Sequence, residues 1–387
     1  MLLAHKIELR PRQAQAEYLS RACGSRRHCY NQLLAHFGQD GVKWSKAAAY
    51  QHYITVLRPQ FLWYGEVSSR VTRNAIDDLD RAFKHFFRRV KTGQKQGKGY
   101  GFPKFKKKGI NDGFALRERP KFDVEGRSLR IEKLATPIQM RQKLRFTGAT
   151  RAVTISQRAG KFYASVLVET EDYNPHAPKP GAVGVDFGVH SLAVMSDGTT
   201  IPANQKLKAN LRRLAHRQRR LSRKRQGSNR RAKAKLSVAR LHKRIADQRQ
   251  AVLHELSDKL TRTHQVVCIE DLNVRGMLKN RRLARAISDA GFGELRRMIE
   301  YKAELRGGRV VVIGRFEPTS KTCSECGQIH DMPLAKREMR CDCGNVADRD
   351  LNAARNILAR GLDTLAPDLK RTQEAGKTGS PARPLTA

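Results

Sequence analysis

The sequence predicts a multidomain protein that combines α/β and α+β architecture. Three observations lead to this prediction. Residues 113–172 alternate apolar and polar side chains as β-strands do, residues 66–90 repeat apolar side chains at helical spacing, and residues 323–343 contain four clustered cysteines. We therefore expect a small β-barrel, a helical lobe, a second α/β domain and a zinc-binding insert. A length of 387 residues fits two or three domains.

The charge of the chain is unusually large and is concentrated in two segments. The net charge is +41, and 39% of the residues are hydrophobic. Residues 201–250 hold 18 Lys and Arg with one acid, Asp247, and residues 81–110 hold 11 with none. Self-repulsion of this size disfavours a compact fold unless a polyanion neutralises it. Nucleic acid is therefore the expected partner.

Membrane and secretory classes are not expected. No apolar run approaches 18 residues, and the first residues lack the apolar stretch of a signal peptide. We expect a cytosolic protein with no membrane partner. In that compartment the clustered cysteines, four of seven, indicate metal binding rather than disulfides.

The first half of the chain divides by its local patterns. A short strand is expected at residues 2–9 and helices over 11–90. Residues 91–109 interleave glycines and lysines with aromatic residues, which suits a loop on a nucleic-acid backbone, although the aromatics are equally able to anchor the loop to its own core. Three prolines near residue 178 mark a linker, and a new domain is expected from Gly181.

The second half contains the most basic segment. Apolar positions at helical spacing predict two antiparallel basic helices within residues 201–262, joined by a turn at residues 227–229. One face would pack on the domain and the other would follow phosphates. Residues 361–387 are rich in Gly, Pro, Ser and Thr and are expected to be disordered.

Carboxylates occupy the ends of apolar segments in this half. Asp186 and Glu270 each end an apolar strand, and Asp348 and Asp350 open a helix. Each alone is ordinary, but together they can converge on a pair of divalent ions about 4 Å apart, which clamps the attacking and leaving oxygens of a phosphodiester. Oxygen ligands suit Mg²⁺ or Mn²⁺.

These motifs are similar to a known family. The strings Gly184–Gly188, Ile269–Val274 and Asp348–Ala354 resemble the split RuvC nuclease of the TnpB (OrfB) proteins of bacterial insertion sequences. The strings Ile287–Gly293 and Pro318–Cys323 resemble the family as well. The similarity covers about residues 1–360, and several independent motifs agree in order and spacing.

The resemblance implies an RNA-guided, Mg²⁺-dependent endonuclease with an RNase H-like (RuvC) domain. Its guide RNA would come from the transposon end, and it would cut double-stranded DNA beside a short transposon-adjacent motif in the bacterial cytosol, at the nucleoid. Asp186, Glu270 and Asp350 would be the catalytic, metal-binding triad, with Asp348 as a helix cap or a group supporting the site. An RNA–DNA heteroduplex would lie in a basic channel between two lobes, recognised by its backbone shape.

The resemblance also gives expected domain boundaries. They are a β-barrel (wedge) domain at 1–10 and 110–180, a helical recognition domain at 11–109, a RuvC-like domain at 181–318, a zinc-binding insert at 319–347, and a last RuvC helix at 348–360.

Four cysteines predict a structural zinc site. Cys323, Cys326, Cys341 and Cys343 form two pairs, each followed by a glycine that suits a tight turn. The second pair is closer than usual, which leaves open whether His330 replaces Cys341 in the Zn²⁺ shell. The other cysteines, Cys23, Cys29 and Cys268, are expected to be buried apolar residues.

Candidate nucleic-acid contacts lie in the helical lobe and its loop. On the helix at 66–90, four polar side chains lie away from the apolar stripe, and Arg and Asn are suited to base edges, although phosphate contacts or plain exposure explain them equally well. The loop adds lysines. The candidates are Ser69, Arg70, Arg73, Asn74, Lys104 and Lys106.

Other functions remain possible or are excluded at this stage. A nuclease-inactive, RNA-guided DNA-binding repressor is the main alternative. A basic zinc-ribbon protein of the ribosome explains the charge and the cysteines but not the carboxylates. A tyrosine transposase with a His-x-His metal pair is excluded, because no two of the 12 histidines are two residues apart.

Overall fold

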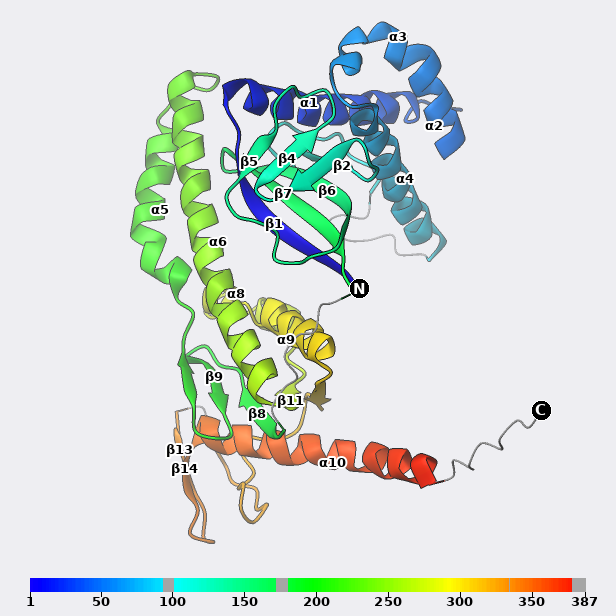
Figure 1. The fold of residues 1–387 in the computed structure, drawn as a ribbon. Coiled ribbons are helices and arrows are strands. Elements are labelled where there is room, and N and C mark those ends of the chain that lie inside the picture. Colours follow the sequence, from blue (N-terminus) through cyan, green and yellow to red (C-terminus); the bar gives the residue numbers. More distant parts are fainter. Residues whose placement is uncertain (93–100, 172–179, 334, 378–387) are drawn as a thin grey trace, which may run out of the picture. The chain divides into compact units, whose positions relative to one another are not determined.

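The computed structural model describes residues 1–92, 101–171, 180–333 and 335–377 (Figure 1). It falls into two compact units, residues 1–173 and 174–387, which are described separately below. No helix among the described residues is both long and apolar enough to cross a membrane.

Unit 1 contains a seven-stranded sheet with the order β2-β6-β7-β1-β5-β4-β3. Its pairings are antiparallel, and β3 packs back against β6, so the sheet is nearly closed. The strands are β1 Leu2–Arg10, β2 Gly113–Leu116, β3 Phe122–Glu125, β4 Ser128–Ile131, β5 Ile138–Met140, β6 Ala149–Arg158 and β7 Lys161–Glu169. The expected small barrel is therefore confirmed as a nearly closed sheet. The turn between β6 and β7 uses Ala159 and Gly160 at positive φ, as a two-residue hairpin requires.

Helices cover this sheet and form a second core beside it. They are α1 Gln13–His36, α2 Lys46–His52, the π-helix η1 Tyr53–Leu57, α3 Arg58–Gln60, the 3₁₀-helix η2 Leu62–Glu66 and α4 Ser69–Lys91. Leu19 of α1 and Val71 of α4 pack on the sheet. Leu33 and Phe83, farther along the same two helices, pack on each other with Tyr53 and Tyr64. Each long helix thus serves both cores.

Unit 2 is built on a five-stranded mixed sheet with the order β10-β9-β8-β11-β12. The strands are β8 Ala182–Asp186, β9 Ser191–Met195, β10 Thr200–Pro202, β11 Val266–Glu270 and β12 Arg309–Ile313. β9 pairs antiparallel with both β8 and β10, whereas β8, β11 and β12 run parallel to one another, with Val185 opposite Ile269. Parallel neighbours bring the carboxyl ends of β8 and β11 to the same edge, where ligands bind in open α/β sheets.

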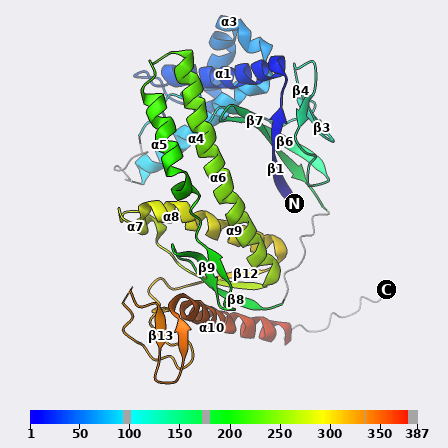
Figure 2. The same ribbon diagram turned by 90° about the vertical axis from the view of Figure 1, so that its left-hand side faces the viewer.

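Both faces of this sheet are covered by helices (Figures 1 and 2). The helices are α5 Lys206–Ser222, α6 Asn229–Thr263, α7 Val274–Met277, α8 Ala284–Ala290, α9 Phe292–Arg306 and α10 Arg349–Lys377. Val183 and Val185 pack with α6 and α9 on one face. Because side chains alternate along a strand, Gly184 and Asp186 face the other side, where α10 lies.

The helix α10 corrects one prediction. Residues 361–377 are helical, so the disordered tail expected from residue 361 is wrong over that range, and residues 378–387 lie outside the described residues. The helix continues because Gly361 packs on β11: a Cβ built there would lie 2.3 Å from the Cys268 sulfur. Leu365, one turn later, is buried in the same small core.

A small insert separates β12 from α10. It contains the hairpin of β13 Glu338–Arg340 and β14 Val346–Asp348 and an isolated bridge between Thr322 and Ile329. The hairpin leads directly into α10, so the insert fixes where that helix begins.

Candidate functional site

Three carboxylates face one another at one edge of the unit 2 sheet. Asp186 and Glu270 end the neighbouring parallel strands β8 and β11. A Cβ built at Gly184 would lie 2.1 Å from the Ala354 carbonyl oxygen, so α10 crosses β8 in direct contact. Asp350 lies one turn before Ala354 on the same side of α10, which directs it toward Asp186.

The electrostatics of this edge follow from burial and like charge. Burial, with repulsion from Glu270 and Asp350, raises the pKa of Asp186 to about 7, and Arg337 and Arg349 oppose that rise. Burial also raises the pKa of Glu270. A cluster of acids that resists ionisation is stabilised by added positive charge. We call Asp186, Glu270 and Asp350 the carboxylate centre.

Neighbouring residues hold the carboxylate centre in place. The Thr319 hydroxyl donates to Glu270 Oε1 at 2.5 Å, and Thr319 is buried. Asp348 Oδ1 accepts from the backbone N–H groups of Asp350 and Leu351 at 2.8 and 3.3 Å. Asp348 therefore caps α10, which agrees with the first of the two roles expected for it. Arg337 donates to Asp350 Oδ2 at 2.5 Å.

The oxygens of this centre are not gathered at ligand spacing. Among the residues that the structure describes, the only group of three or more Asp, Glu, His or Cys with ligand atoms all within 4.8 Å is the cysteine cluster. Asp350 is ion-paired with Arg337. The donor set of oxygens fits Mg²⁺ or Mn²⁺, and Arg337 contacts only one of the two Asp350 oxygens, Oδ2.

The cysteine cluster fits a zinc ion. Cys323 and Cys343 have sulfurs 3.7 Å apart, and Cys326 and Cys341 have sulfurs 3.4 Å apart. Four sulfurs bound tetrahedrally at about 2.3 Å from Zn²⁺ lie about 3.8 Å from one another. His330 is not part of this group, so the geometry favours four cysteines over a Zn²⁺ shell that includes His330.

Two asparagines connect the cysteine cluster to the carboxylate centre. Asn352, fully buried on α10, donates to the Thr322 carbonyl at 2.7 Å and accepts from the Ser324 N–H at 2.9 Å. Asn356, one turn later, donates to the Thr319 and Thr322 carbonyls at 2.7 Å. The loop that carries Thr319 and the first cysteine pair is thus fastened to the helix that carries Asp350.

The sequence analysis missed the roles of Thr319, Asn352, Asn356 and Asp289. The Asp289 carboxylate is buried and accepts from the backbone N–H groups of Leu207, at 2.9 and 3.0 Å, and Lys208, at 3.1 Å. It therefore anchors the start of α5. The available signals in the sequence were that Asn352 and Asn356 lie four residues apart and that Asp289 lies within an apolar helix. Neither signal identifies the residues that these side chains contact.

The basic helices of unit 2 form the expected antiparallel hairpin. α5 and α6 pack side by side, joined by a turn at residues 223–228. Leu214, Leu241 and Ile245 form a small apolar core between them. Most of their Lys and Arg side chains are exposed.

Of the six residues of unit 1 predicted to contact nucleic acid, some already contact other residues of the protein and others are exposed. Arg70 pairs with Glu118, Asn74 Oδ1 accepts from the Ala115 N–H at 2.7 Å, and Lys106 donates to Asp78 at 2.5 Å. Arg73 lies 5.3 Å from the Tyr50 ring centre. Ser69 and Lys104 are exposed. Asn74 and Lys106 thus have structural contacts, and a nucleic-acid role for all six residues stays a prediction.

The aromatic residues of the loop at residues 91–109 also differ in their contacts. Phe102 packs edge-on against Phe83 and Phe86, with ring centres 5.4 and 5.6 Å apart, so it anchors the loop to its own core. Phe105 is exposed. Tyr100 lies outside the described residues. Cys23, Cys29 and Cys268 are buried, as predicted.

Comparison with known proteins gives consistent matches. Family models described as "Probable transposase" (OrfB, IS605), "Cas12f1-like, TNB domain" and "Helix-turn-helix domain" match residues 165–281, 292–357 and 1–37. A Streptomyces pristinaespiralis protein named "Putative RNA-guided DNA endonuclease" is 40% identical over 97% of this chain and 94% of its own length. "Putative RNA-guided DNA endonuclease InsQ" of Escherichia coli K12 is 34% identical over 94% of each chain.

A solved structure shows the same fold. The Cas12f1 chain of a Cas12f1–sgRNA–target DNA complex aligns with a TM-score of 0.53 at 15% identity, over 89% of this chain and 83% of that chain. Together with the sequence matches over nearly the full length, this shows that the chain belongs to the TnpB (OrfB) family.

Proposed function

We propose that this chain is an RNA-guided, Mg²⁺- or Mn²⁺-dependent endonuclease that cleaves double-stranded DNA beside a short transposon-adjacent motif. The observation that carries the proposal is the convergence of Asp186, Glu270 and Asp350 from β8, β11 and α10. The names of the two relatives support guidance by RNA and cleavage of DNA. The guide RNA would derive from the transposon end, and the site of action would be the bacterial nucleoid.

Each part of the carboxylate centre has a role in this proposal. Asp186, Glu270 and Asp350 would hold the divalent ions. Bound ions supply Lewis-acid stabilisation of the attacking and leaving oxygens of a phosphodiester. Thr319 fixes the orientation of Glu270 through its hydroxyl, and Asp348 fixes the first turn of α10 through two backbone N–H groups. Arg337 neutralises Asp350 until a cation replaces it.

A second candidate is an RNA-guided DNA-binding repressor without cleavage activity. The ion pair between Arg337 and Asp350 favours it, because that pair already neutralises one of the three carboxylates. The two functions share RNA and DNA partners and differ only in whether the carboxylate centre binds ions. A cleavage assay therefore separates them.

The test begins with the RNA that purifies with the protein from its native expression context. That RNA is sequenced, and the complex is incubated with Mg²⁺ and a plasmid that carries the matching target between randomised flanks. Cutting beside one short motif, abolished in Asp186→Ala with RNA binding kept, supports the endonuclease. Guided binding without cutting establishes the repressor. The absence of a defined RNA contradicts both functions.

A further inference from the structure

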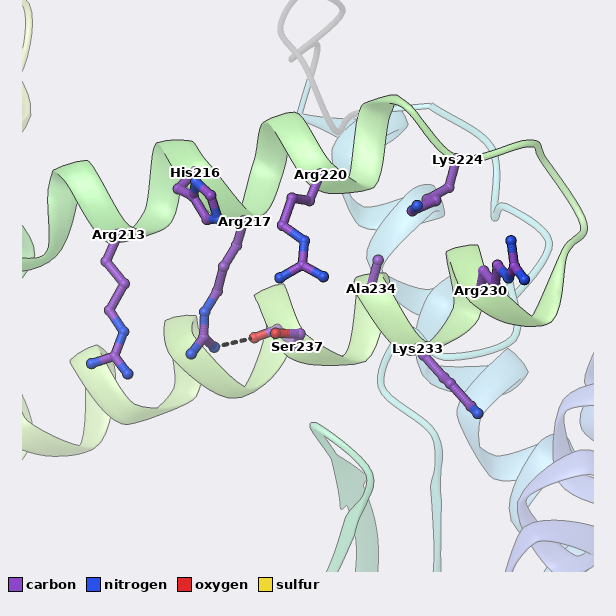
Figure 3. A pocket seen from close by; sticks show the side chains of 9 residues that line it. All are labelled: Arg213, His216, Arg217, Arg220, Lys224, Arg230, Lys233, Ala234 and Ser237. Atoms are coloured by element: carbon purple, nitrogen blue, oxygen red, sulfur yellow. Dashed lines mark hydrogen bonds between the residues drawn. The ribbon is translucent and has the colours of Figure 1, made fainter.

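A hollow lies between α5 and α6 near the turn that joins them (Figure 3). Its volume is about 670 Å³. Arg213, Arg217 and Arg220 point into it from α5, and Lys224 lines it at the turn. Arg230 and Lys233 of α6 complete a lining of six cations. We call this hollow the basic cleft.

The sequence explains why the hairpin is hollow here. Arg213, Arg217 and Arg220 follow each other at four and three residues, so they lie on one face of α5. Opposite them α6 presents Ala234 and Ser237, which are too small to fill the space. Farther from the turn, leucine and isoleucine side chains close the gap between the helices. The hairpin is therefore apolar and closed at its base and cationic and open near its turn.

Hydrogen bonds across the hairpin fix the spacing of the two helices that form the cleft. The Arg217 guanidinium reaches from α5 to the Ser237 carbonyl of α6 at 2.8 Å, as Figure 3 shows. Arg231 donates to the Leu221 and Lys224 carbonyls at 3.1 and 2.8 Å, which ties the turn to α6. The walls are thus fixed relative to each other before any ligand arrives.

The charge of the cleft requires an anionic occupant. Its lining residues include no carboxylate. Asp247, the acid of residues 201–250, pairs with Lys243 at 2.5 Å, outside the cleft. Six cations that line one hollow repel each other, and a chain of phosphodiesters relieves that repulsion at several points at once.

The shape of the cleft favours an unpaired strand. The hollow measures about 670 Å³ and lies within a single pair of helices. A duplex is wide enough that its major groove alone admits a whole α-helix, so it contacts only the rim of such a hollow, whereas the backbone of a single strand is narrow enough to enter. Apart from the imidazole of His216, the lining has no aromatic ring for base stacking, so the contacts would not depend on sequence.

We propose that the basic cleft binds the backbone of an unpaired nucleic-acid segment, independently of its sequence. The identity of the polyanion rests on the proposed function. Two sources share this chemistry, an unpaired stretch of guide RNA and a DNA strand displaced from the target. The test distinguishes them by the probe.

The test compares two fourfold variants with the same charge change on the same helices. The cleft variant is Arg213→Gln, Arg220→Gln, Arg230→Gln and Lys233→Gln. The matched control is Arg212→Gln, Arg219→Gln, Lys235→Gln and Arg240→Gln, whose side chains are exposed on α5 and α6 but do not line the cleft. The full-length protein is freed of nucleic acid and titrated, in buffer without Mg²⁺ or Mn²⁺, with oligo-rU, oligo-dT and a DNA hairpin duplex by fluorescence anisotropy.

We expect the cleft variant to lose about 10- to 100-fold in single-strand affinity and about 3 units of salt slope, since each phosphate contact contributes about 0.7. The control should lose less than about 3-fold. A greater loss for rU assigns the cleft to RNA, and a greater loss for dT assigns it to DNA. Equal losses in the two fourfold variants, or an equal loss for the duplex, overturn the proposal. Because cleavage would require Mg²⁺ or Mn²⁺, which this buffer omits, the result is independent of whether the protein is a nuclease.

Discussion

The carboxylate centre and the basic cleft are both clusters of like charge in unit 2, and they are built in opposite ways. The three acids come from β8, β11 and α10, elements far apart in the sequence, and burial raises the pKa of two of them. The six cations come from two consecutive helices and the turn between them, and four of the six are exposed. The acids are placed by the whole sheet, whereas the cations are placed by one hairpin.

This difference has a consequence for stability and for specificity. Half-buried acids repel one another at low dielectric, so the carboxylate centre by itself destabilises the fold, and bound cations would relieve that repulsion. Exposed cations are screened by water and salt, so the cleft costs less and binds anions with a strong dependence on salt. We expect changes at the centre to act on cleavage and stability together, and changes at the cleft to act mainly on binding.

The largest effect should come from Asp186→Asn. Cleavage should fall about 1,000-fold or more, because loss of a metal-ligand charge costs several kcal/mol in the transition state. Without Mg²⁺ or Mn²⁺ the variant should be more stable than the wild type at neutral pH by an amount on the order of 2 kcal/mol. The folded-state pKa of Asp186 is raised to about 7, so the wild type loses stability relative to the variant as pH rises from about 4 to 7. Thermal unfolding from pH 4 to 8 in buffer without Mg²⁺ or Mn²⁺ measures the difference.

The controls for this variant use the same melts. Mg²⁺ should raise the melting temperature of the wild type and leave that of Asp186→Asn almost unchanged. Equal stability of the two proteins at pH 8 without Mg²⁺ or Mn²⁺ would show that the acids do not repel one another, and the contrast with the basic cleft would fail.

Loss of one zinc ligand should have the next largest effect. Cys341→Ser should abolish zinc binding and destabilise the insert by several kcal/mol, since structural zinc contributes directly to folding. Because Asn352 and Asn356 join this loop to α10, deuterium exchange should rise from residue 318 into α10. His330→Ala should keep one zinc per chain by elemental analysis. Loss of zinc in His330→Ala would contradict the four-cysteine assignment.

Thr319→Val tests whether a residue that orients one of the acids contributes to the cleavage rate. It removes the hydroxyl that donates to Glu270 and keeps the side-chain shape. We expect a 10- to 100-fold lower cleavage rate with RNA binding unchanged, the usual range for a residue that orients a metal ligand. Thr319→Ser should restore the rate. A failure of serine to restore it would indicate a packing role instead.

The anchoring of the basic hairpin should have a smaller effect. Asp289→Asn weakens three charge-assisted hydrogen bonds to the start of α5, and we expect a loss of about 1–2 kcal/mol in unfolding free energy and weaker binding of oligo-dT. Asp247→Asn, in an exposed pair on the same hairpin, should change stability by less than about 0.5 kcal/mol. Similar effects of both changes would mean that Asp289 acts only through the overall charge.

The two clusters also differ in how far the sequence predicts them. Helical spacing around Gly227 suffices for the hairpin, because α5 and α6 are neighbours in the sequence. Apolar strands ending in Asp186 and Glu270 identify candidate acids, but their meeting depends on the parallel pairing of Val185 with Ile269. The residue pattern alone suggests that the acids can converge, and the resemblance to the TnpB family is what selects Asp350 rather than Asp348 as the third of them.

The remaining parts depend on contacts that no local pattern contains. Thr319 reaches Glu270 across 49 residues, and Asp289 reaches Leu207 across 82. The helix beyond residue 360 was missed because Gly361 there signals close packing on Cys268 rather than the end of the helix. A glycine is found both at helix ends and at close helix contacts, and local composition does not distinguish these two structural roles.

The smallest expected effect separates the two acids at the start of α10. Asp348 accepts from two backbone N–H groups, as a helix cap does, whereas Asp350 faces Asp186. Asp348→Ser keeps a capping oxygen and should leave cleavage unchanged and stability within about 0.5 kcal/mol, and Asp348→Ala should cost about 1 kcal/mol. Asp350→Asn should abolish cleavage. If Asp348→Ser lost cleavage as fully as Asp350→Asn, both acids would serve the metal, and the centre would contain four carboxylates rather than three.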